Sequence, residues 1–221
     1  MKYVSGYRGG VRKMNVLAKA ISLLSMGRIS MEEKILDIPL LNNISDSLSV
    51  VNCELQSYCD LFYDEEIHYP YSLKQAIINL TNCLELLIKY RLIAEHWAFI
   101  FDDVNKAKET SLDSGDFISV SFIKGIERLK NICNIDIDKY FKFSRDLYKL
   151  RNKLVHYTLT DSLKNVLGII NGSIMDLNTF VSEEIVNYID NDDAIKEIKA
   201  DLKTLTEINK IIKSFSSNVD D

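Results

Sequence analysis

Residues 73–101, LKQAIINLTNCLELLIKYRLIAEHWAFIF, form the longest apolar stretch of the chain and decide its fold. Apolar residues recur at helical spacing nearly all round this stretch, not on one face alone. With Ser72 as N-cap, the pattern predicts a single helix of about 28 residues. A helix that is apolar on nearly every side has to be covered by other elements, so we expect it at the centre of a helical bundle.

Helical patterns on either side of this stretch extend the bundle. Residues 44–62 have helical periodicity with Ser45 or Asp46 as N-cap, and a connector broken at Pro70 follows them. A short helix is expected at 14–26, behind a basic, glycine-containing arm at 1–13. After a polar loop at 102–116, four more helices are predicted: 117–132, 137–160, a helix capped by Asp161 that runs to 181, and 192–215.

The composition favours helices over strands. Gly and Pro, which punctuate loops and turns, number only 8 and 2 in a chain of 221 residues. We therefore predict an all-α, antiparallel helical bundle with extra N- and C-terminal helices. It divides into a basic arm with short helices at 1–43, the bundle at 44–190, and a helix at 191–221 that packs on the bundle or on a dimer partner. That last helix has an apolar stripe at Ile195, Ile198, Leu202, Leu205, Ile208 and Ile212.

Charge and cysteine usage exclude several classes of protein. A formal net charge of −5 argues against a broadly basic coat for nucleic acid and leaves room only for a local basic patch. The four cysteines lie far apart without a C-x-x-C pair, which predicts reduced thiols in the core of a cytoplasmic protein, with no metal and no cofactor. No apolar run reaches the roughly 18 residues of a membrane helix, and Lys19 interrupts the one stretch that resembles a signal peptide.

The second informative stretch is LYKLRNKLVHY, residues 147–157. At about 100° per residue, Asn152 and His156 are neighbours one turn apart on the face opposite the apolar stripe of this helix. His156 is therefore not expected in the core of its own bundle. Arg151 lies roughly 140° from His156, so its guanidinium has to reach around the helix or meet the histidine across a dimer. The opposite, core-facing stripe consists of Phe143, Leu147, Leu150 and Leu154.

The R-N-x-x-x-H spacing of Arg151, Asn152 and His156 resembles the signature of the HEPN superfamily. These are helical-bundle proteins, many of them metal-independent ribonucleases, with an arginine, usually a polar residue after it, and a histidine four to six residues further on. Glu85 and Lys89 are similar to the acidic residue and lysine that many HEPN proteins have one turn apart on an early long helix. The resemblance covers roughly residues 70–160, and Tyr157 departs from the H-x-Y of some HEPN toxins by following the histidine directly.

This resemblance implies RNA cleavage by the 2′-hydroxyl at a site shared by two subunits of a homodimer. A histidine near neutral pKa serves as general base or acid, and an arginine fork stabilises charge on the phosphoryl oxygens. Asn152 would orient the histidine or donate to phosphate, and the products would be a 2′,3′-cyclic phosphate and a 5′-hydroxyl. The implied setting is a bacterial toxin or antiphage defence system, with an antitoxin or another regulatory protein as a possible partner.

The same residues are also compatible with roles that involve no catalysis. Asn152 and His156 fit a solvated helix face, and Arg151 fits an ion pair with Asp146 or with a residue on another helix. Glu85 and Lys89 form a favourable i, i+4 pair, and His96 shares their helical stripe, which makes it a third supporting candidate. The alternative function is a non-catalytic HEPN-like module that binds RNA or a partner protein, and a weaker one is a structural dimerisation protein.

Overall fold

The computed structural model describes residues 37–61, 71–108, 117–156, 161–189 and 192–216. The arm at 1–13, the helix expected at 14–26 and the connector at 62–70 lie outside these ranges. Within them the chain is helical, without a strand, and the only β contact is an isolated antiparallel bridge between Phe101 and Ser119. The prediction of an all-α protein is confirmed.

The main helices follow one another in a simple order. They are α2 (Asp37–Leu61), α3 (Tyr71–Glu95), α5 (Phe122–Cys133), α6 (Ile137–Tyr140), α7 (Ser144–His156), α8 (Leu163–Phe180) and α9 (Asp192–Ser216). Short 3-10 turns occur at Trp97–Ile100, Val104–Lys106 and Val186–Tyr188, and a π turn at Val181–Ile185 continues α8.

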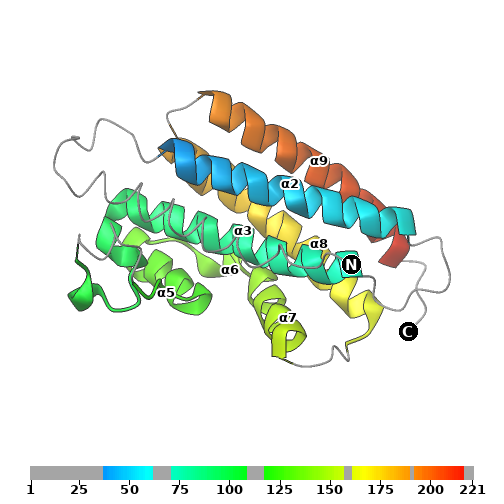
Figure 1. The fold of residues 1–221 in the computed structure, drawn as a ribbon, viewed down its shortest axis with the longest axis horizontal. Coiled ribbons are helices and arrows are strands. Elements are labelled where there is room, and N and C mark those ends of the chain that lie inside the picture. The colour runs from blue at the N-terminus through cyan, green and yellow to red at the C-terminus, as the bar shows by residue number, and fades with distance from the viewer. Residues whose placement is uncertain (1–36, 62–70, 109–116, 157–160, 190–191, 217–221) are drawn as a thin grey trace, which may run out of the picture.

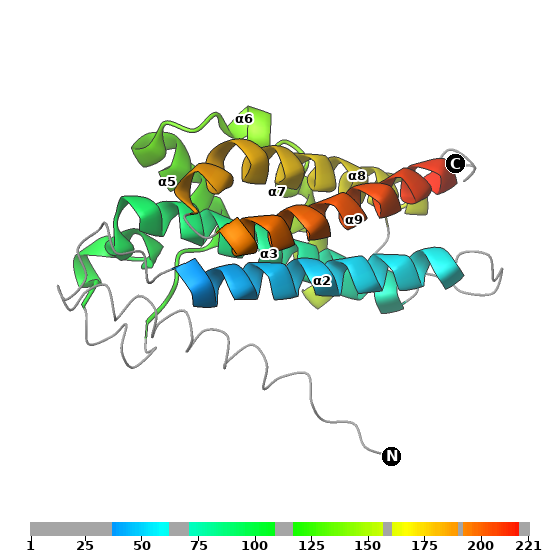
Figure 2. The same ribbon diagram turned by 90° about the horizontal axis from the view of Figure 1, so that it is seen from above.

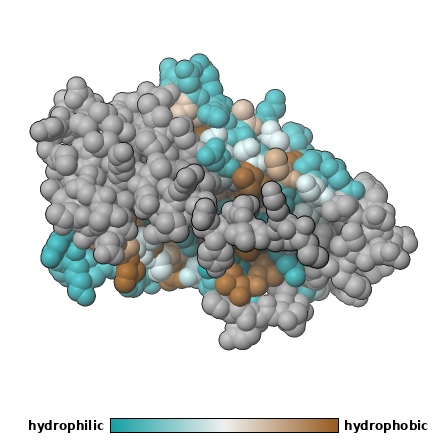
Figure 3. Space-filling model, in the orientation of Figure 1, coloured by the Kyte–Doolittle hydropathy of each residue, from teal (hydrophilic) through white to brown (hydrophobic). Residues whose placement is uncertain are grey.

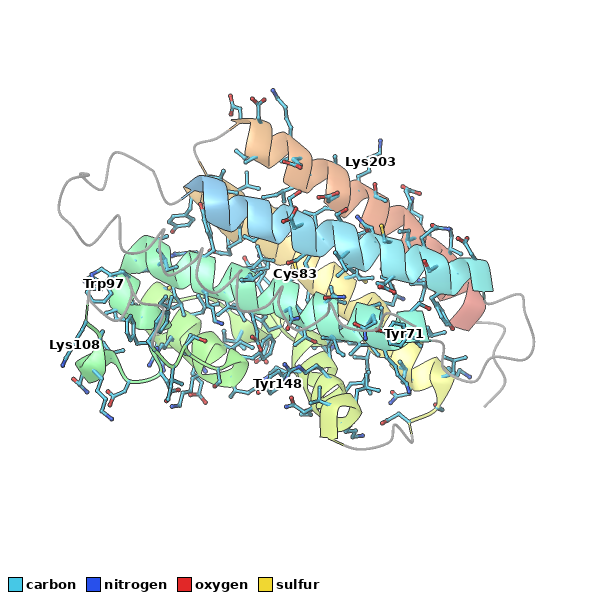
Figure 4. The ribbon with its side chains drawn as sticks, in the orientation of Figure 1. Tyr71, Cys83, Trp97, Lys108, Tyr148 and Lys203 are labelled. Atoms are coloured by element: carbon cyan, nitrogen blue, oxygen red, sulfur yellow. The ribbon has the colours of Figure 1, made fainter. Side chains whose placement is uncertain are left out.

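Helix α3 lies at the centre of the arrangement. It packs against α2 on one side and against α5 and α7 on the other, with Tyr71 and Trp97 labelled at its two ends (Figures 1 and 4). Helix α9 lies along α2 and α8, as the view from above also shows (Figure 2). Helix α7 is steeply inclined to α3 and packs against both α3 and α8 (Figure 1). Helix α7, which bears the candidate residues, therefore packs against two other helices.

The core forms around α3 as its sequence predicts. Leu80, Leu92 and Ile93 are at most 5 % exposed although they lie on different sides of the helix. Each such side chain contributes about 1.5–3 kcal/mol through burial. The stripe of α9 faces inward, with Ile198, Leu205 and Ile212 fully buried. Outside the core, described surface residues of the face in Figure 3 are mostly hydrophilic, with smaller hydrophobic spots between them.

Two predicted helix boundaries in the first half are wrong. Helix α3 ends at Glu95, since His96 is extended (φ −166°, ψ 134°), and Ser72 lies inside the helix instead of capping it. Helix α2 begins at Asp37, so Ser45 and Asp46 are interior residues. The Ser45 hydroxyl instead donates to Asp201 of α9 at 2.8 Å, a tertiary partner that a search for a local cap does not consider.

The second half also departs from the prediction. The helix expected over 137–160 is split into α6 and α7 by a break at residues 141–143. Helix α5 begins only at Phe122, because the segment before it is extended and bridges to Phe101. The N-cap of α8 is Ser162, whose hydroxyl accepts from the Asn165 N–H at 3.3 Å. The residue predicted as the cap, Asp161, instead forms an ion pair with Lys153 of α7 at 2.9 Å.

Candidate functional site

Asp176 of α8 anchors the first turn of α7, the helix that bears the arginine. Its buried carboxylate accepts from the Phe143 and Ser144 N–H groups, at 2.8 Å each, and from the Ser144 hydroxyl at 2.9 Å. Burial raises the pKa of Asp176, and the hydrogen bonds from Ser144 and Phe143 and the charge of Arg145 act against that rise. A negative charge at the N-terminus of a helix also interacts favourably with the helix dipole. The break before α7 therefore has a tertiary cause.

The flanks of α7 are packed against its neighbours. Leu147 and Leu150 are at most 2 % exposed, and the Tyr148 ring stacks on Phe122 of α5 with centroids 4.8 Å apart. Across the seam with α8, a Cβ on Gly172 would lie 2.2 Å from the Phe143 ring, so α7 and α8 approach too closely for a larger residue. These contacts hold the first half of α7 against α5 and α8.

The other cations on this helix are neutralised by carboxylates. Arg145 pairs with Asp138 at 2.6 Å, Lys149 with Asp146 at 2.8 Å and Lys153 with Asp161 at 2.9 Å. Because Asp146 pairs with Lys149, the alternative in which it neutralises Arg151 is wrong.

Arg151 differs from those neighbours. Among the residues that the structure describes it meets no carboxylate, and its one hydrogen bond runs from Nη1 to the Asn152 side-chain oxygen at 3.1 Å. Its Nε is buried and has no partner there. Arg151 and Asn152 are both partly exposed. A guanidinium placed this way keeps most of its donors available to an anion from outside.

His156 is the last residue of α7, and its side chain lies outside the described part of the structure. The predicted meeting of His156 with Arg151 therefore stays a prediction. Asn152, one turn earlier, is half-buried and accepts from Arg151, so its amide oxygen is already used by the arginine.

Glu85 and Lys89 lie close together on α3. The contact that Lys89 makes across the fold is with the segment before α5, not with α7. The charged atoms of Glu85 and Lys89 are 4.0 Å apart, and the side chain of Lys89 is only 12 % exposed. Burial lowers the pKa of Lys89, and the charge of Glu85 raises it in part. The Lys89 ammonium donates to the Ser119 hydroxyl at 3.2 Å. Ser119 was missed because it lies 30 residues away, in a segment whose sequence is typical of a helix.

His96 is not on the stripe of Glu85 and Lys89, because α3 has ended one residue before it. Its ring is exposed and lies beside Trp97 and Phe99, with centroids 5.5 Å and 5.7 Å away. Its Nδ1 accepts from the Ala98 N–H at 3.1 Å, which begins the following 3-10 turn. The structure gives His96 a capping role and does not bring it to the other two candidates.

A further charged group that the sequence analysis missed is buried near the end of α3. Arg91 is 3 % exposed, donates to Glu95 and to the Tyr188 hydroxyl at 2.7 Å each, and lies over the Tyr188 ring. Only the i, i+4 spacing of Arg91 and Glu95 signals this pair in the sequence. The guanidinium of Arg91 binds Glu95 of α3 and Tyr188 of the 3-10 turn at Val186–Tyr188. Arg91 therefore connects α3 to the turn that follows α8.

The described residues contain no group of three or more His, Cys, Asp or Glu side chains close enough to bind a metal ion. Cys59 and Cys83 are buried free thiols, and burial raises their pKa to about 11 and about 12. Cys53, by contrast, is exposed, so the expected core position fails for that thiol. None of the described helices has the length and apolarity that crossing a membrane requires.

Comparison of the chain with known proteins found no match, either among family models, among curated proteins or among solved structures. Function is therefore inferred from the chain's own residues.

Proposed function

We propose that this protein is a metal-independent endoribonuclease of the HEPN type, with a composite site at the interface of a homodimer. In this proposal Arg151 binds the scissile phosphate, His156 is the general base or acid, and Asn152 orients them. The observation that supports it best is Arg151 itself: it has no carboxylate partner among the described residues, on a helix where Arg145, Lys149 and Lys153 each have one.

That difference matters because a paired arginine would have to give up its carboxylate before it could bind a phosphate. Arg151 loses only one hydrogen bond to a neutral amide, and the anion gains two parallel charge-assisted bonds. The buried, unpartnered Nε is a donor that a bound oxygen would satisfy after a small movement of the side chain. The site is therefore suited to an oxyanion.

The chemistry needs no metal. The 2′-hydroxyl attacks the adjacent phosphorus, His156 takes its proton, and the bond to the 5′ oxygen breaks as that oxygen receives a proton. Arg151 stabilises the charge that grows on the non-bridging oxygens during this step. The products are a 2′,3′-cyclic phosphate and a 5′-hydroxyl.

The angle between two residues of one helix supports the dimer. Residues 151 and 156 are roughly 140° apart on an α-helix, so one copy of α7 presents them on different sides. A twofold axis beside α7 would bring the arginine of one subunit to the histidine of the other. We also propose a role in a toxin or antiphage system, restrained by an antitoxin or regulatory protein, and Glu85 and Lys89 as supporting residues, both on the resemblance alone.

The decisive experiment incubates the purified protein with mixed RNA and tRNA in EDTA, beside Arg151→Ala and His156→Ala. We expect cleavage with cyclic-phosphate ends, and a loss of about a hundredfold or more in each variant, since one base or one charge stabiliser is removed. The matched control is Lys149→Ala, which removes a carboxylate-paired cation two residues from Arg151 and is expected to stay within about threefold of wild type.

The other outcomes discriminate clearly. Cleavage that survives both substitutions would contradict the assignment of the site. If all four proteins are folded and dimeric and none cleaves, but RNA binding is lost in Arg151→Ala alone, the non-catalytic RNA-binding module replaces the nuclease.

A further inference from the structure

We propose that Ser119 and Lys89 form a serine–lysine dyad in which Ser119 is a nucleophile toward carboxylic esters and Lys89 is its general base. This proposal uses neither Arg151 nor His156 and goes beyond the proposed nuclease activity. It stands on the contact between the two side chains, on the burial of the amine, and on the exposure of the serine.

The amine and the hydroxyl are in contact across the fold. Lys89 Nζ lies 3.2 Å from Ser119 Oγ, and this is the one hydrogen bond of the amine among the described residues. The Lys89 side chain is 12 % exposed, whereas Ser119 is partly exposed and its neighbours Ile118 and Ser121 are exposed. A molecule from outside can therefore approach the hydroxyl while the amine lies beneath it.

The surroundings of Lys89 favour an uncharged amine. Burial lowers the pKa of Lys89, because an ammonium loses its hydration there, and Glu85 counters this only in part. Glu85 is 24 % exposed and its carboxylate is 4.0 Å away, at the outer limit of an ion pair. An amine that is neutral in a larger fraction of molecules is able to accept the hydroxyl proton.

The serine is held in place, and main-chain donors lie close to it in the chain. Its bridge partner Phe101 belongs to a segment whose carbonyl oxygens at Phe99, Phe101 and Asp102 all accept from Arg128. The N–H of Ser119 makes no hydrogen bond to the described residues. Helix α5 begins three residues later, and its N-cap Ser121 makes no side-chain cap, so first-turn N–H groups are also available. Such N–H groups are the donors that stabilise a carbonyl oxyanion.

The reaction proceeds in two balanced halves. Ser119 Oγ attacks the ester carbonyl while its proton passes to Lys89 Nζ, and the bond to the alkoxy group breaks as Lys89 returns the proton to the leaving oxygen. Water then attacks the acyl-serine with Lys89 again accepting and returning a proton. The carboxylic acid is released and both side chains are restored.

The test is labelling of the full chain with an alkyl fluorophosphonate, followed by peptide mass spectrometry. We expect a covalent adduct on Ser119, absent in Ser119→Ala and formed at least tenfold more slowly in Lys89→Met, which keeps the length of the side chain. Ser121→Ala, an exposed serine two residues away, and Lys149→Ala, an exposed lysine of α7, should both react as wild type does. Hydrolysis of p-nitrophenyl acetate should follow the same order.

Two results would overturn the dyad: no adduct on Ser119 in the wild type, or equal rates in Lys89→Met and wild type. If Lys89→Met does not fold, the pH dependence of wild-type labelling decides instead. The rate should rise with pH to a plateau whose midpoint lies below the ordinary lysine pKa of 10.5. A rate that shows no midpoint below that value would contradict Lys89 as the base.

Discussion

The interface between α7 and α8 (the α7–α8 seam) and the interface between α3 and α5 (the α3–α5 seam) are similar in packing. They differ in how many hydrogen bonds and ion pairs compensate a buried charge. Each has a glycine where two helices approach closely, Gly172 against Phe143 in one and Gly125 against Ile88 in the other. Each also holds a mostly buried ionisable side chain. Within the described ranges Asp176 accepts three hydrogen bonds, two of them from main-chain N–H groups, whereas Lys89 has one hydrogen bond and a long ion pair.

The difference separates a structural charge from a reactive one. A carboxylate oxygen that accepts three hydrogen bonds at the start of a helix stabilises that helix, although burial still raises the pKa of Asp176. An amine that is buried with incomplete compensation is destabilising as an ion, and it therefore tends to lose its proton. Incompletely compensated groups of this kind are concentrated at functional sites.

The largest expected effect contrasts the two charges directly. Asp176→Ala should lower the free energy of unfolding by about 3 kcal/mol, because two main-chain N–H groups and a hydroxyl lose their buried acceptor. Lys89→Met should change it by less than about 1 kcal/mol, or stabilise the fold, since a desolvated charge is replaced by an apolar chain. Urea denaturation at pH 7 measures both.

Two controls sharpen that contrast. Asp176→Asn keeps an acceptor oxygen and should retain part of the stability, and Asp146→Ala, exposed on α7, should stay within about 0.5 kcal/mol of wild type. Equal losses in Asp176→Ala and Lys89→Met would mean that the two seams do not differ as described.

The next largest effect concerns the glycines of the two seams. Gly172→Ala should destabilise by about 2 kcal/mol, since its Cβ would lie 2.2 Å from the Phe143 ring. Gly125→Ala meets only the Ile88 Cγ2 methyl at 2.7 Å and should lose about 1 kcal/mol.

Gly168 in the same helix as Gly172 is the matched control for overpacking. A Cβ there meets nothing within 4 Å, so Gly168→Ala should stabilise α8 by up to about 1 kcal/mol. Thermal melts of the three variants check the order, and a Gly172→Ala protein as stable as Gly168→Ala would show that the α7–α8 seam is looser than the structure indicates.

The smallest effect is a pH dependence in the alkaline range, which belongs to the seam that holds Lys89. The pKa of Lys89 is lowered in the folded protein, so between that value and the ordinary 10.5 the unfolded chain binds more protons than the folded one. Stability should therefore rise with pH across this window, relative to Lys89→Met. Denaturation of both proteins from pH 7 to 10.5 tests the difference, with the exposed Lys124→Met as a control that keeps the wild-type slope.

Much of the architecture was predictable from apolar periodicity alone. The all-round apolar pattern of residues 73–95 correctly predicted a buried central helix, and the stripe from Ile198 to Ile212 correctly predicted the packed face of α9. The polar face of α7, with Arg151 and Asn152 partly exposed, was also predictable, because burial of a helical stripe follows from its spacing.

The helix ends and the partners of the charged groups were not predictable in the same way. The break before α7 depends on Asp176, more than 30 residues later. The end of α3 depends on His96, which caps the following 3-10 turn, and the start of α5 depends on the bridge between Ser119 and Phe101. A local capping search sees only residues adjacent in the chain, whereas these hydrogen bonds join residues that folding brings together.

By itself the sequence determined that the protein is helical, which helix is central, and that α7 has Asn152 on its polar face with Arg151 to one side of it. Only the tertiary structure decided that Asp146 and Asp161 pair with lysines and leave Arg151 without a carboxylate among the described residues, and that Lys89 meets Ser119. The physical reason is that periodicity depends on the spacing of residues along one helix. Ion pairs and hydrogen bonds depend on which side chains compete for the same partner in space.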